Sequence, residues 1–186
     1  MFHRILVINP GSTSTKVGVY INEQPLCVST IRHTVEELMQ YEQIIDQHDF
    51  RQQLVIDWLK ANDIPFEFDA IIGRGGLIKP IPGGVYRVNR KMVYETYYAL
   101  RKHACNLGCI IAYELAKQQQ NGCKAYIADP VTVDELLPEA RVSGSPLMPR
   151  LAIWHALNQR AIARRYASEI GSQYEDLNLI LLSLIH

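Results

Sequence analysis

Residues 4–21, RILVINPGSTSTKVGVYI, place two β-branched segments on either side of a run of small polar residues. The alternation predicts a strand over residues 4–8, a turn over residues 9–15 and a returning strand over residues 16–21. Another turn precedes a third strand-like segment over residues 26–31. The chain is therefore expected to begin with an antiparallel meander.

The rest of the chain alternates between helix and strand patterns. Asp49 has the side chain of an N-cap, and the apolar residues after it recur at helical spacing, so a helix is expected to begin there. A short buried-type strand over residues 70–73 follows. The further predicted elements are an irregular loop around residues 80–84, a helix over residues 91–120 with a break near His103, a strand over residues 125–128, a helix over residues 151–168 and a strand over residues 177–182. This order predicts an α/β fold in which helices flank a mixed sheet.

Composition and charge exclude several classes of protein. The 186 residues are 48% hydrophobic and 20% charged, which is typical of a folded globular chain. Lys and Arg together number 19, as do Asp and Glu, so there is no net field to hold a nucleic acid or an anionic membrane. Without a membrane-spanning or signal pattern, the cytoplasm is the expected location. The four cysteines lack zinc-site spacing and are expected to be reduced thiols.

Residues 9–16, NPGSTSTK, have the composition of an anion-binding loop. Gly11 permits a tight turn in which backbone N–H groups converge, and the hydroxyl groups that follow, with Lys16, could surround a phosphate. The segment is not the nucleotide-binding P-loop, which needs a second glycine before the lysine, a hydroxyl residue after it and then a helix. A polar hairpin loop without a ligand is the alternative.

Four further residues could carry chemistry. Arg74 lies between a strand end and two glycines, where a guanidinium can reach a carboxylate or phosphate, although an exposed arginine in a turn is the simpler interpretation. Asp129 follows a predicted strand and could hold Mg²⁺ directly or through water, or could cap a helix. His155 and His103 each accompany a helix pattern, and such histidines are commonly structural.

Five segments in this order resemble the amino-terminal half of the butyrate kinase family. They are ILVINPGSTSTKVGVY, IIGRGGLIKPIPGGVYRVN, HACNLGCIIAYELA, YIADPVTVDEL and HALNQRAIARRYA. The family belongs with acetate kinase in the superfamily that includes sugar kinases, Hsc70 and actin. The resemblance implies two ribonuclease-H-like α/β domains with the substrates between them, of which this chain contains the first. It also implies reversible, Mg²⁺-dependent transfer of phosphate between ATP and butyrate, giving butyryl phosphate and ADP.

The resemblance also implies roles for individual residues. Arg74 would bind the substrate carboxylate or the transferring phosphoryl group, and His155 would stabilise that group with support from His103. Asp129 would orient Mg²⁺ or the nucleophile, and Asn9 would contribute to the magnesium site. The residues expected to line the phosphate and nucleotide site are Gly11, Ser12, Thr13, Ser14 and Lys16.

The sequence departs from the family pattern near residue 182. In the family the strand matching residues 177–182 leads into a glycine-rich turn, where this chain has the apolar residues LSLIH at 182–186. We therefore expect residues 1–176 to form the first domain and residues 177–186 to be a truncated or frame-shifted start of the second. A homo-oligomer is expected only for an intact chain. The alternatives are a non-catalytic remnant that binds at most phosphate or a partner, and an unrelated phosphate-binding module.

Overall fold

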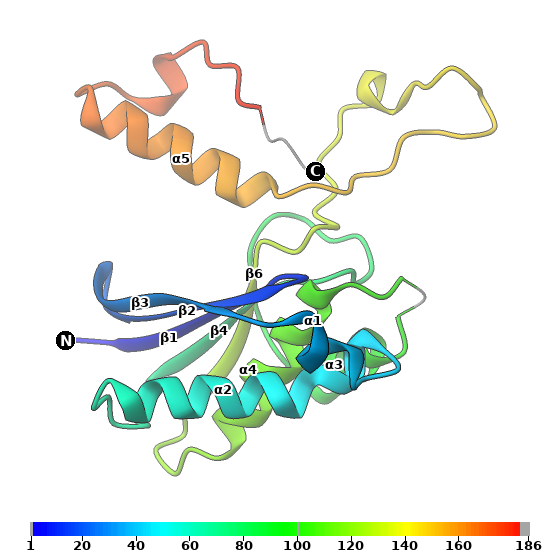
Figure 1. Ribbon diagram of the computed structural model, residues 1–186. Coiled ribbons are helices and arrows are strands. Elements are labelled where there is room, and N and C mark those ends of the chain that lie inside the picture. The colour runs from blue at the N-terminus through cyan, green and yellow to red at the C-terminus, as the bar shows by residue number, and fades with distance from the viewer. Residues whose placement is uncertain (1, 100, 183–186) are drawn as a thin grey trace.

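A computed structural model describes residues 2–99 and 101–182 (Figure 1). Within them, six strands form one sheet in the order β3-β2-β1-β4-β6-β5. The first three strands are the predicted antiparallel meander, and β4 and β6 continue the sheet parallel to β1. The strands are β1 (Arg4–Pro10), β2 (Ser14–Ile21), β3 (Gln24–Arg32), β4 (Ala70–Arg74), β5 (Val85–Arg87) and β6 (Lys124–Ala128). The predicted mixed sheet is confirmed.

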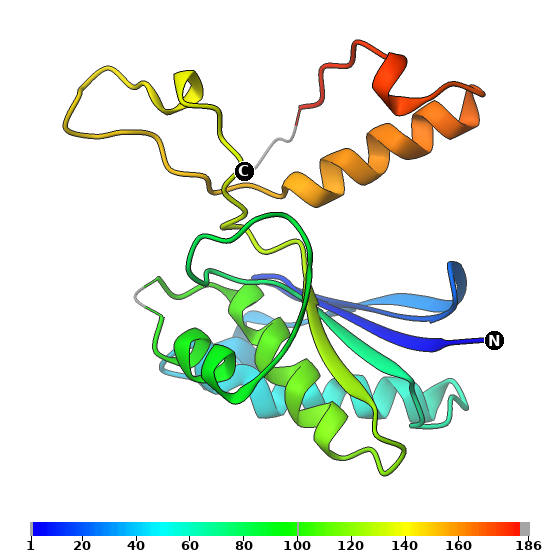
Figure 2. The same cartoon turned by 180° about the vertical axis from the view of Figure 1, so that it is seen from behind.

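Three of the helices cover one face of this sheet. Figures 1 and 2 show α2, α3 and α4 on the same side, with α4 packed on β4 and β6. The helices are α1 (Val35–Met39), α2 (His48–Ala61), α3 (Arg90–Tyr97), α4 (Leu107–Lys117) and α5 (Ala156–Glu169), with 3₁₀ turns η1 (Ile44–Gln47), η2 (Ala104–Asn106), η3 (Glu139–Arg141) and η4 (Tyr174–Asp176). The predicted break near His103 is confirmed, because η2 separates α3 from α4.

The core lies between the sheet and these helices. Every second residue of the central strands is buried, which is the period expected of a strand that presents one face to a helical layer. The buried set includes Leu6, Ile8, Val17, Val19, Ile71 and Ile127 from the strands, and Val55, Leu59, Leu107, Ile111 and Leu115 from α2 and α4.

A contact between two glycines sets the distance from α4 to the sheet. A Cβ on Gly73 would lie 2.0 Å from the carbonyl oxygen of Gly108, and a Cβ on Gly108 would lie 2.4 Å from the carbonyl oxygen of Arg74. Both distances are too short for any side chain, so only glycine allows the helix to approach this closely. The same contact fixes the backbone at the end of β4, where Arg74 begins to leave the sheet.

The start of α2 differs from the prediction. The helix begins at His48 with Gln47 at its N-cap, because the chain enters it directly from η1 and no side-chain cap is needed. Asp49 is an exposed residue of the first turn, where it pairs with His48 at 3.3 Å. The short elements α1 and β5 were not predicted, although Thr34 and Glu37 form a capping box at the start of α1.

Two predictions for the last third of the chain are wrong in detail. The final helix begins at Ala156 rather than residue 151, because Trp154 is held in extended backbone by a hydrogen bond to the carbonyl of Val131 at 2.8 Å. Residues 177–182 do not form a strand. No neighbouring strand pairs with them, and Ile180 is 93% exposed, so the alternating apolar pattern has no face to bury. The end of the predicted apolar tail, residues 183–186, lies outside the described residues.

The segment after β6 stands apart from the sheet layer. Figures 1 and 2 show α5, η3 and η4 beyond the end of the sheet to which the carboxyl ends of β4 and β6 point. A parallel bridge from Ile81 to Val133 connects this segment to the loop after β4, and a second bridge, from Thr132 to Trp154, lies within the segment. No helix within the described ranges is long and apolar enough to cross a membrane.

Candidate active site

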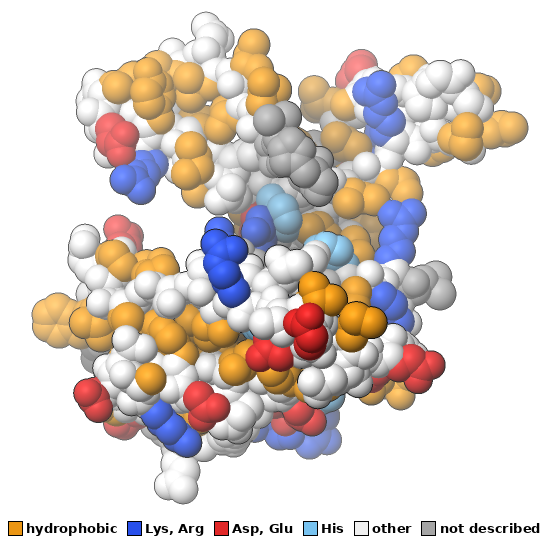
Figure 3. Space-filling model, in the orientation of Figure 1, with side chains coloured by type: hydrophobic (Ala, Val, Ile, Leu, Met, Phe, Trp, Pro, Cys, Tyr) orange, Lys and Arg blue, Asp and Glu red, His pale blue; other side chains and the backbone are white. Residues whose placement is uncertain are grey.

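A cavity of about 180 Å³ opens where α5 meets the carboxyl ends of the central strands. Figure 3 shows histidine and basic side chains gathered in this region, between the sheet layer and the segment after it. Seven of the ten predicted site residues line the cavity, namely Asn9, Gly11, Ser14, Lys16, Arg74, His103 and His155. The structure therefore brings together residues that are separated by up to 146 positions in the sequence.

The loop between β1 and β2 forms one wall of this cavity. Gly11 donates a backbone hydrogen bond to the carbonyl of Ser14 at 2.7 Å, which closes the tight turn that the sequence predicts. Lys16 lies on β2 opposite Asn9 of β1, so both residues are close to the turn. Ser12 and Thr13, at the tip, are exposed and do not line the cavity.

Asp129 connects the two predicted catalytic residues without lining the cavity itself. Its Oδ2 lies 3.3 Å from Nη2 of Arg74 and 3.3 Å from Nδ1 of His155. Its Oδ1 accepts a hydrogen bond from the backbone N–H of Leu157 at 3.1 Å, in the first turn of α5. One carboxylate thus holds the end of β4, the side chain of His155 and the start of α5 in a fixed relation.

The glycines around Arg74 allow this arrangement. A Cβ on Gly75 would lie 2.8 Å from Pro130, and a Cβ on Gly76 would lie 2.4 Å from Oδ1 of Asn106. That amide oxygen instead accepts a hydrogen bond from the N–H of Leu77 at 2.8 Å. The loop after β4 therefore packs directly against the loops after β6 and before α4.

The two histidines differ in which ring nitrogen carries the proton of the neutral ring. Nδ1 of His103 accepts a hydrogen bond from the backbone N–H of Cys105 at 3.2 Å, so in the neutral ring the proton resides on Nε2. Nδ1 of His155 faces two acceptors of Asp129, the carbonyl and Oδ2, each at 3.3 Å, so it carries a proton. His103 can therefore donate from Nε2 when neutral, whereas His155 donates from Nε2 only as imidazolium.

Cys105 contributes a thiol to the same cavity. Its side chain is buried, and burial raises the pKa of the thiol to about 11 although Arg74 acts in the opposite direction. The sulfur lies 3.0 Å from Nδ1 of His103. At neutral pH Cys105 is thus a neutral wall of the cavity rather than a thiolate nucleophile.

The donor set fits a magnesium ion shared with a substrate better than one held by protein alone. Within residues 2–99 and 101–182 there is no group of three or more His, Cys, Asp or Glu side chains that could hold a metal ion. Mg²⁺ commonly takes one or two protein oxygens and completes its shell with water and phosphate. Asn9 lines the cavity and fits that role. Both oxygens of Asp129 already accept protein hydrogen bonds, so Asp129 fits it through water.

Sequence reasoning missed Cys105, which lines the cavity, and Arg51 of α2, which lies behind its loop. The side chain of Arg51 is completely buried and hydrogen-bonds to the loop of residues 11–15 from behind. A signal was present, because Arg51 occupies the same helical face as Val55 and Leu59, both of which are buried. A charged residue within an apolar face indicates a specific buried partner.

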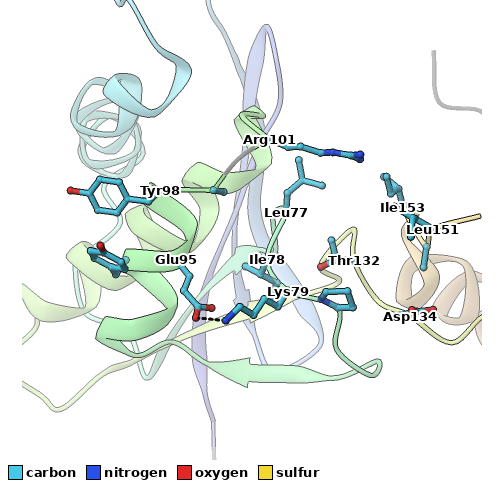
Figure 4. Close-up of a pocket in the computed structure, with 14 residues that line it drawn as sticks. Leu77, Ile78, Lys79, Glu95, Tyr98, Arg101, Thr132, Asp134, Leu151 and Ile153 are labelled. Atoms are coloured by element: carbon cyan, nitrogen blue, oxygen red, sulfur yellow. Dashed lines mark hydrogen bonds and ion pairs between the residues drawn. The ribbon is translucent and has the colours of Figure 1, made fainter. Parts of the chain in front are cut away.

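A second, larger cavity of about 570 Å³ is lined in part by the loop that follows Arg74 and by the residues that precede His155 (Figure 4). Most of its lining is apolar, with Leu77 on one side and Leu151 and Ile153 on the other. Lys79 and Glu95, which pair at 3.0 Å, lie at its edge. Leu77 follows Arg74 by three residues and Ile153 precedes His155 by two, so the same two chain segments border both cavities.

Comparison with known proteins shows which sequences this chain is similar to. No protein-family model matches the chain. It is 64% identical over 181 residues to a protein named probable butyrate kinase from Bacteroides thetaiotaomicron, covering 97% of this chain and 51% of that protein. The chain is therefore similar to one half of a protein named probable butyrate kinase. It is also 50% identical over 184 residues to butyrate kinase 1 of Clostridium acetobutylicum, covering 98% of this chain and 51% of the relative. It therefore spans about half the length of the relatives it matches.

Solved structures show the same fold at low sequence identity. The chain matches acetate kinase from Porphyromonas gingivalis with a TM-score of 0.61 and 14% identity, over 92% of this chain and 50% of that one. A propionate kinase from Francisella tularensis gives a TM-score of 0.61 and 12% identity, over 92% of this chain and 50% of that one. The predicted α/β fold, a mixed sheet flanked by helices, is confirmed by these matches, whereas the division into domains and the roles of individual residues stay predictions.

Proposed function

We propose that this chain supplies the carboxylate- and phosphoryl-binding part of a butyrate kinase, which transfers phosphate reversibly between ATP and a short-chain carboxylate. The observation that carries the proposal is the convergence of Lys16, Arg74, His103 and His155 on one small cavity beside a tight polar turn. The similarity to proteins named butyrate kinase supports the reaction class. The structural match to acetate and propionate kinases supports the fold that the reaction needs.

The chemistry requires cations more than it requires a base. A carboxylate is already a competent nucleophile at neutral pH, so the main barrier is the approach of two anions. The guanidinium of Arg74 and the ammonium of Lys16 offset that repulsion, and Nε2–H of His103 can donate to an equatorial oxygen of the transferring group. Asp129 keeps Nδ1 of His155 protonated, which directs Nε2 of that ring toward the cavity. Bound Mg²⁺, with Asn9 among its ligands, would add charge neutralisation at the phosphates.

The apolar cavity of Figure 4 suits the alkyl chain of the acid. Each methylene buried there adds about 0.8 kcal/mol to binding. We therefore propose that acids of four or five carbons are preferred over acetate. A shorter acid would bind at Arg74 but leave the cavity wall formed by Leu77 and Ile153 without contact.

The remaining assignments extend this proposal to the intact protein. Residues 1–176 would form the first domain, and residues 177–182 would lead into the second, which would complete the nucleotide site. ATP or ADP and the acid or acyl phosphate would be the partners, in a cytoplasmic enzyme that forms a homo-oligomer. The alternative is a chain that binds phosphate without catalysing transfer, which the half-length match to the relatives keeps open.

A chimera tests the proposal directly. This chain would replace the matching half of the 64% identical relative, and a hydroxamate assay with ATP and Mg²⁺ would measure acyl phosphate from acetate, propionate, butyrate, isobutyrate and valerate. We expect activity with an optimum at four or five carbons. Arg74→Ala and His155→Ala should each lower turnover about 10²-fold or more, whereas Lys16→Ala should be milder. Arg165→Ala, on the exposed face of α5, is the matched control. Full activity in both site variants, or an acetate optimum, would contradict the proposal.

A further inference from the structure

We propose that Arg51 is a positioning residue that holds the loop of residues 11–15 in its anion-binding shape. The inference deepens the proposed function and rests on it, because it assumes that this loop receives a phosphoryl group. Arg51 lies on α2, does not itself line the cavity, and hydrogen-bonds to the lining residues Gly11 and Ser14 through their backbone carbonyls. Its action would therefore pass through the loop rather than through direct contact with substrate.

The guanidinium of Arg51 hydrogen-bonds to three backbone carbonyl groups on one side of the loop. Nη1 donates to the carbonyl of Gly11 at 2.7 Å and to the carbonyl of Ser14 at 3.2 Å, and Nη2 donates to the carbonyl of Ser12 at 3.3 Å. The remaining carbonyl, that of Thr13, accepts from the backbone N–H of His33 at 3.0 Å. All four carbonyls from residue 11 to residue 14 are thus bound by protein donors.

This arrangement determines where the amide groups point. The C=O and N–H of one peptide unit point in opposite directions, so turning the carbonyls of Gly11 and Ser12 toward Arg51 turns the N–H groups of Ser12 and Thr13 away from it. Within the part of the chain that the structure describes, neither N–H group has a protein acceptor. The N–H groups of Ser12 and Thr13 therefore point outward beside Lys16. An oxyanion can accept hydrogen bonds from such a pair of neighbouring backbone donors.

The position of the guanidinium is itself fixed by Gln47. One turn earlier on the chain, Oε1 of Gln47 accepts from Nε of Arg51 at 3.1 Å and from Nη2 at 2.9 Å. Within residues 2–99 and 101–182 no carboxylate is among the hydrogen-bond partners of Arg51, which are carbonyl, amide and hydroxyl oxygens. An uncompensated buried cation is costly for folding. An anion bound on the other side of the loop would supply the missing charge.

The guanidinium stays charged although it is buried. Burial lowers the pKa of Arg51 to about 10, which is still well above neutral pH. Neighbouring His33 shares the hydroxyl of Thr15 with Arg51, and burial together with the charge of Arg51 lowers the pKa of that imidazole. Arg51 is thus the cation behind the loop under physiological conditions.

The test separates shape from charge and from stability. The ¹⁵N-labelled chain would be titrated with inorganic phosphate and with butyryl phosphate, following the amide signals of Ser12 and Thr13, and thermal unfolding would be recorded in parallel. Arg51→Lys keeps the charge but cannot reach three carbonyls and Gln47 together. Gln47→Leu keeps the guanidinium and removes only its anchor. Arg165→Lys, at an exposed pair with Glu169, is the matched control.

We expect phosphate to bind the wild-type chain with shifts at both amides, and to bind Arg51→Lys at least tenfold more weakly. Gln47→Leu should weaken binding in the same direction, which decides the question if Arg51→Lys fails to fold. If Arg51 has a merely structural role, the substitutions will lower the unfolding temperature without changing the phosphate affinity of the folded variants. That result would overturn this inference and leave the proposed function standing. Wild-type chain that binds neither phosphate compound would overturn the proposed function as well.

Discussion

Substitution of Asp129 tests how the two sides of the candidate site are held together. Its carboxylate accepts from Arg74 and His155 with Oδ2 and caps α5 through Leu157 with Oδ1. Its backbone also has a φ of 52°, in the left-handed region that Asp and Asn tolerate better than Ala. Substitution of Asp129 by Asn, Gly or Ala therefore changes different combinations of its side-chain contacts and its backbone strain.

The magnitudes follow from the contacts. A hydrogen bond to a charged group contributes about 1.5–3 kcal/mol, and the long 3.3 Å separations place both Oδ2 contacts at about 1 kcal/mol each. Asp129→Asn keeps the cap on α5 and should cost about 2 kcal/mol. Asp129→Gly also loses the cap, about 1 kcal/mol, but gains a similar amount because glycine adopts positive φ freely. Asp129→Ala loses both contacts and the cap, and alanine is strained at positive φ by about 1 kcal/mol more than aspartate, so it should cost about 4 kcal/mol.

Urea unfolding at pH 7 would measure these differences. The two tryptophans report separately, since Trp58 lies on α2 and Trp154 precedes His155. We expect the Trp154 signal to change first in every Asp129 variant. Asp134→Asn, which disrupts an exposed bidentate pair with Arg141, is the control and should shift the midpoint far less. Equal stability of Asp129→Ala and Asp129→Gly, or no loss in Asp129→Asn, would refute this account of the contacts.

Three further outcomes are expected from the packing and exposure of the chain. Gly108→Ala should destabilise the fold by about 1–3 kcal/mol, although alanine is the better helix former. Gly144→Ala is the control, because open space surrounds Gly144, and it should not destabilise the fold. Thermal unfolding of both variants measures the difference. Burial raises the pKa of Cys105 and Cys109 to about 11 from an unfolded value of 9.0, so their contribution to stability is complete below pH 9 and is lost as pH rises toward 11. Unfolding temperatures measured from pH 8 to pH 10.5 should fall, and less steeply in Cys109→Ala. Ile162→Glu, on the exposed face of α5, should reduce concentration-dependent self-association in sedimentation velocity, and unchanged association would exclude that face.

The first strands and the tight turn between β1 and β2 could be predicted because their causes are local. Alternation of β-branched residues fixes β1 and β2, and the turn residues between them leave no other geometry. Arg74 and Asp129 could be identified as candidates from the sequence for the same reason. Arg74 ends the short apolar strand β4, and Asp129 directly follows the short apolar strand β6. Parallel neighbouring strands end at one edge of a sheet, so residues at those ends meet.

The parts that could not be predicted depend on contacts distant in sequence. The start of α5 is set by a backbone bond from Trp154 to Val131 and by the cap from Asp129, neither of which local spacing records. Residues 177–182 have the composition of a strand, but no neighbour pairs with them. Arg51 was missed because a helical arginine is ordinarily exposed, and only its register with Val55 and Leu59 indicates that it is buried.

Three features that cost stability converge on the same end of the sheet. Arg51 is a buried cation with no carboxylate partner among the described residues, and the backbone of Asp129 lies in the left-handed region. Gly73 and Gly108 have no side chains, which allows α4 to approach β4 closely. Each has a more stable alternative that would preserve the general fold, such as an apolar residue on α2 or a wider spacing between helix and sheet. What those alternatives would lose is the placement of the loop, of Arg74 and of the start of α5. All three features lie next to residues that line one cavity, so the proposed site gives a reason for them that the fold alone does not.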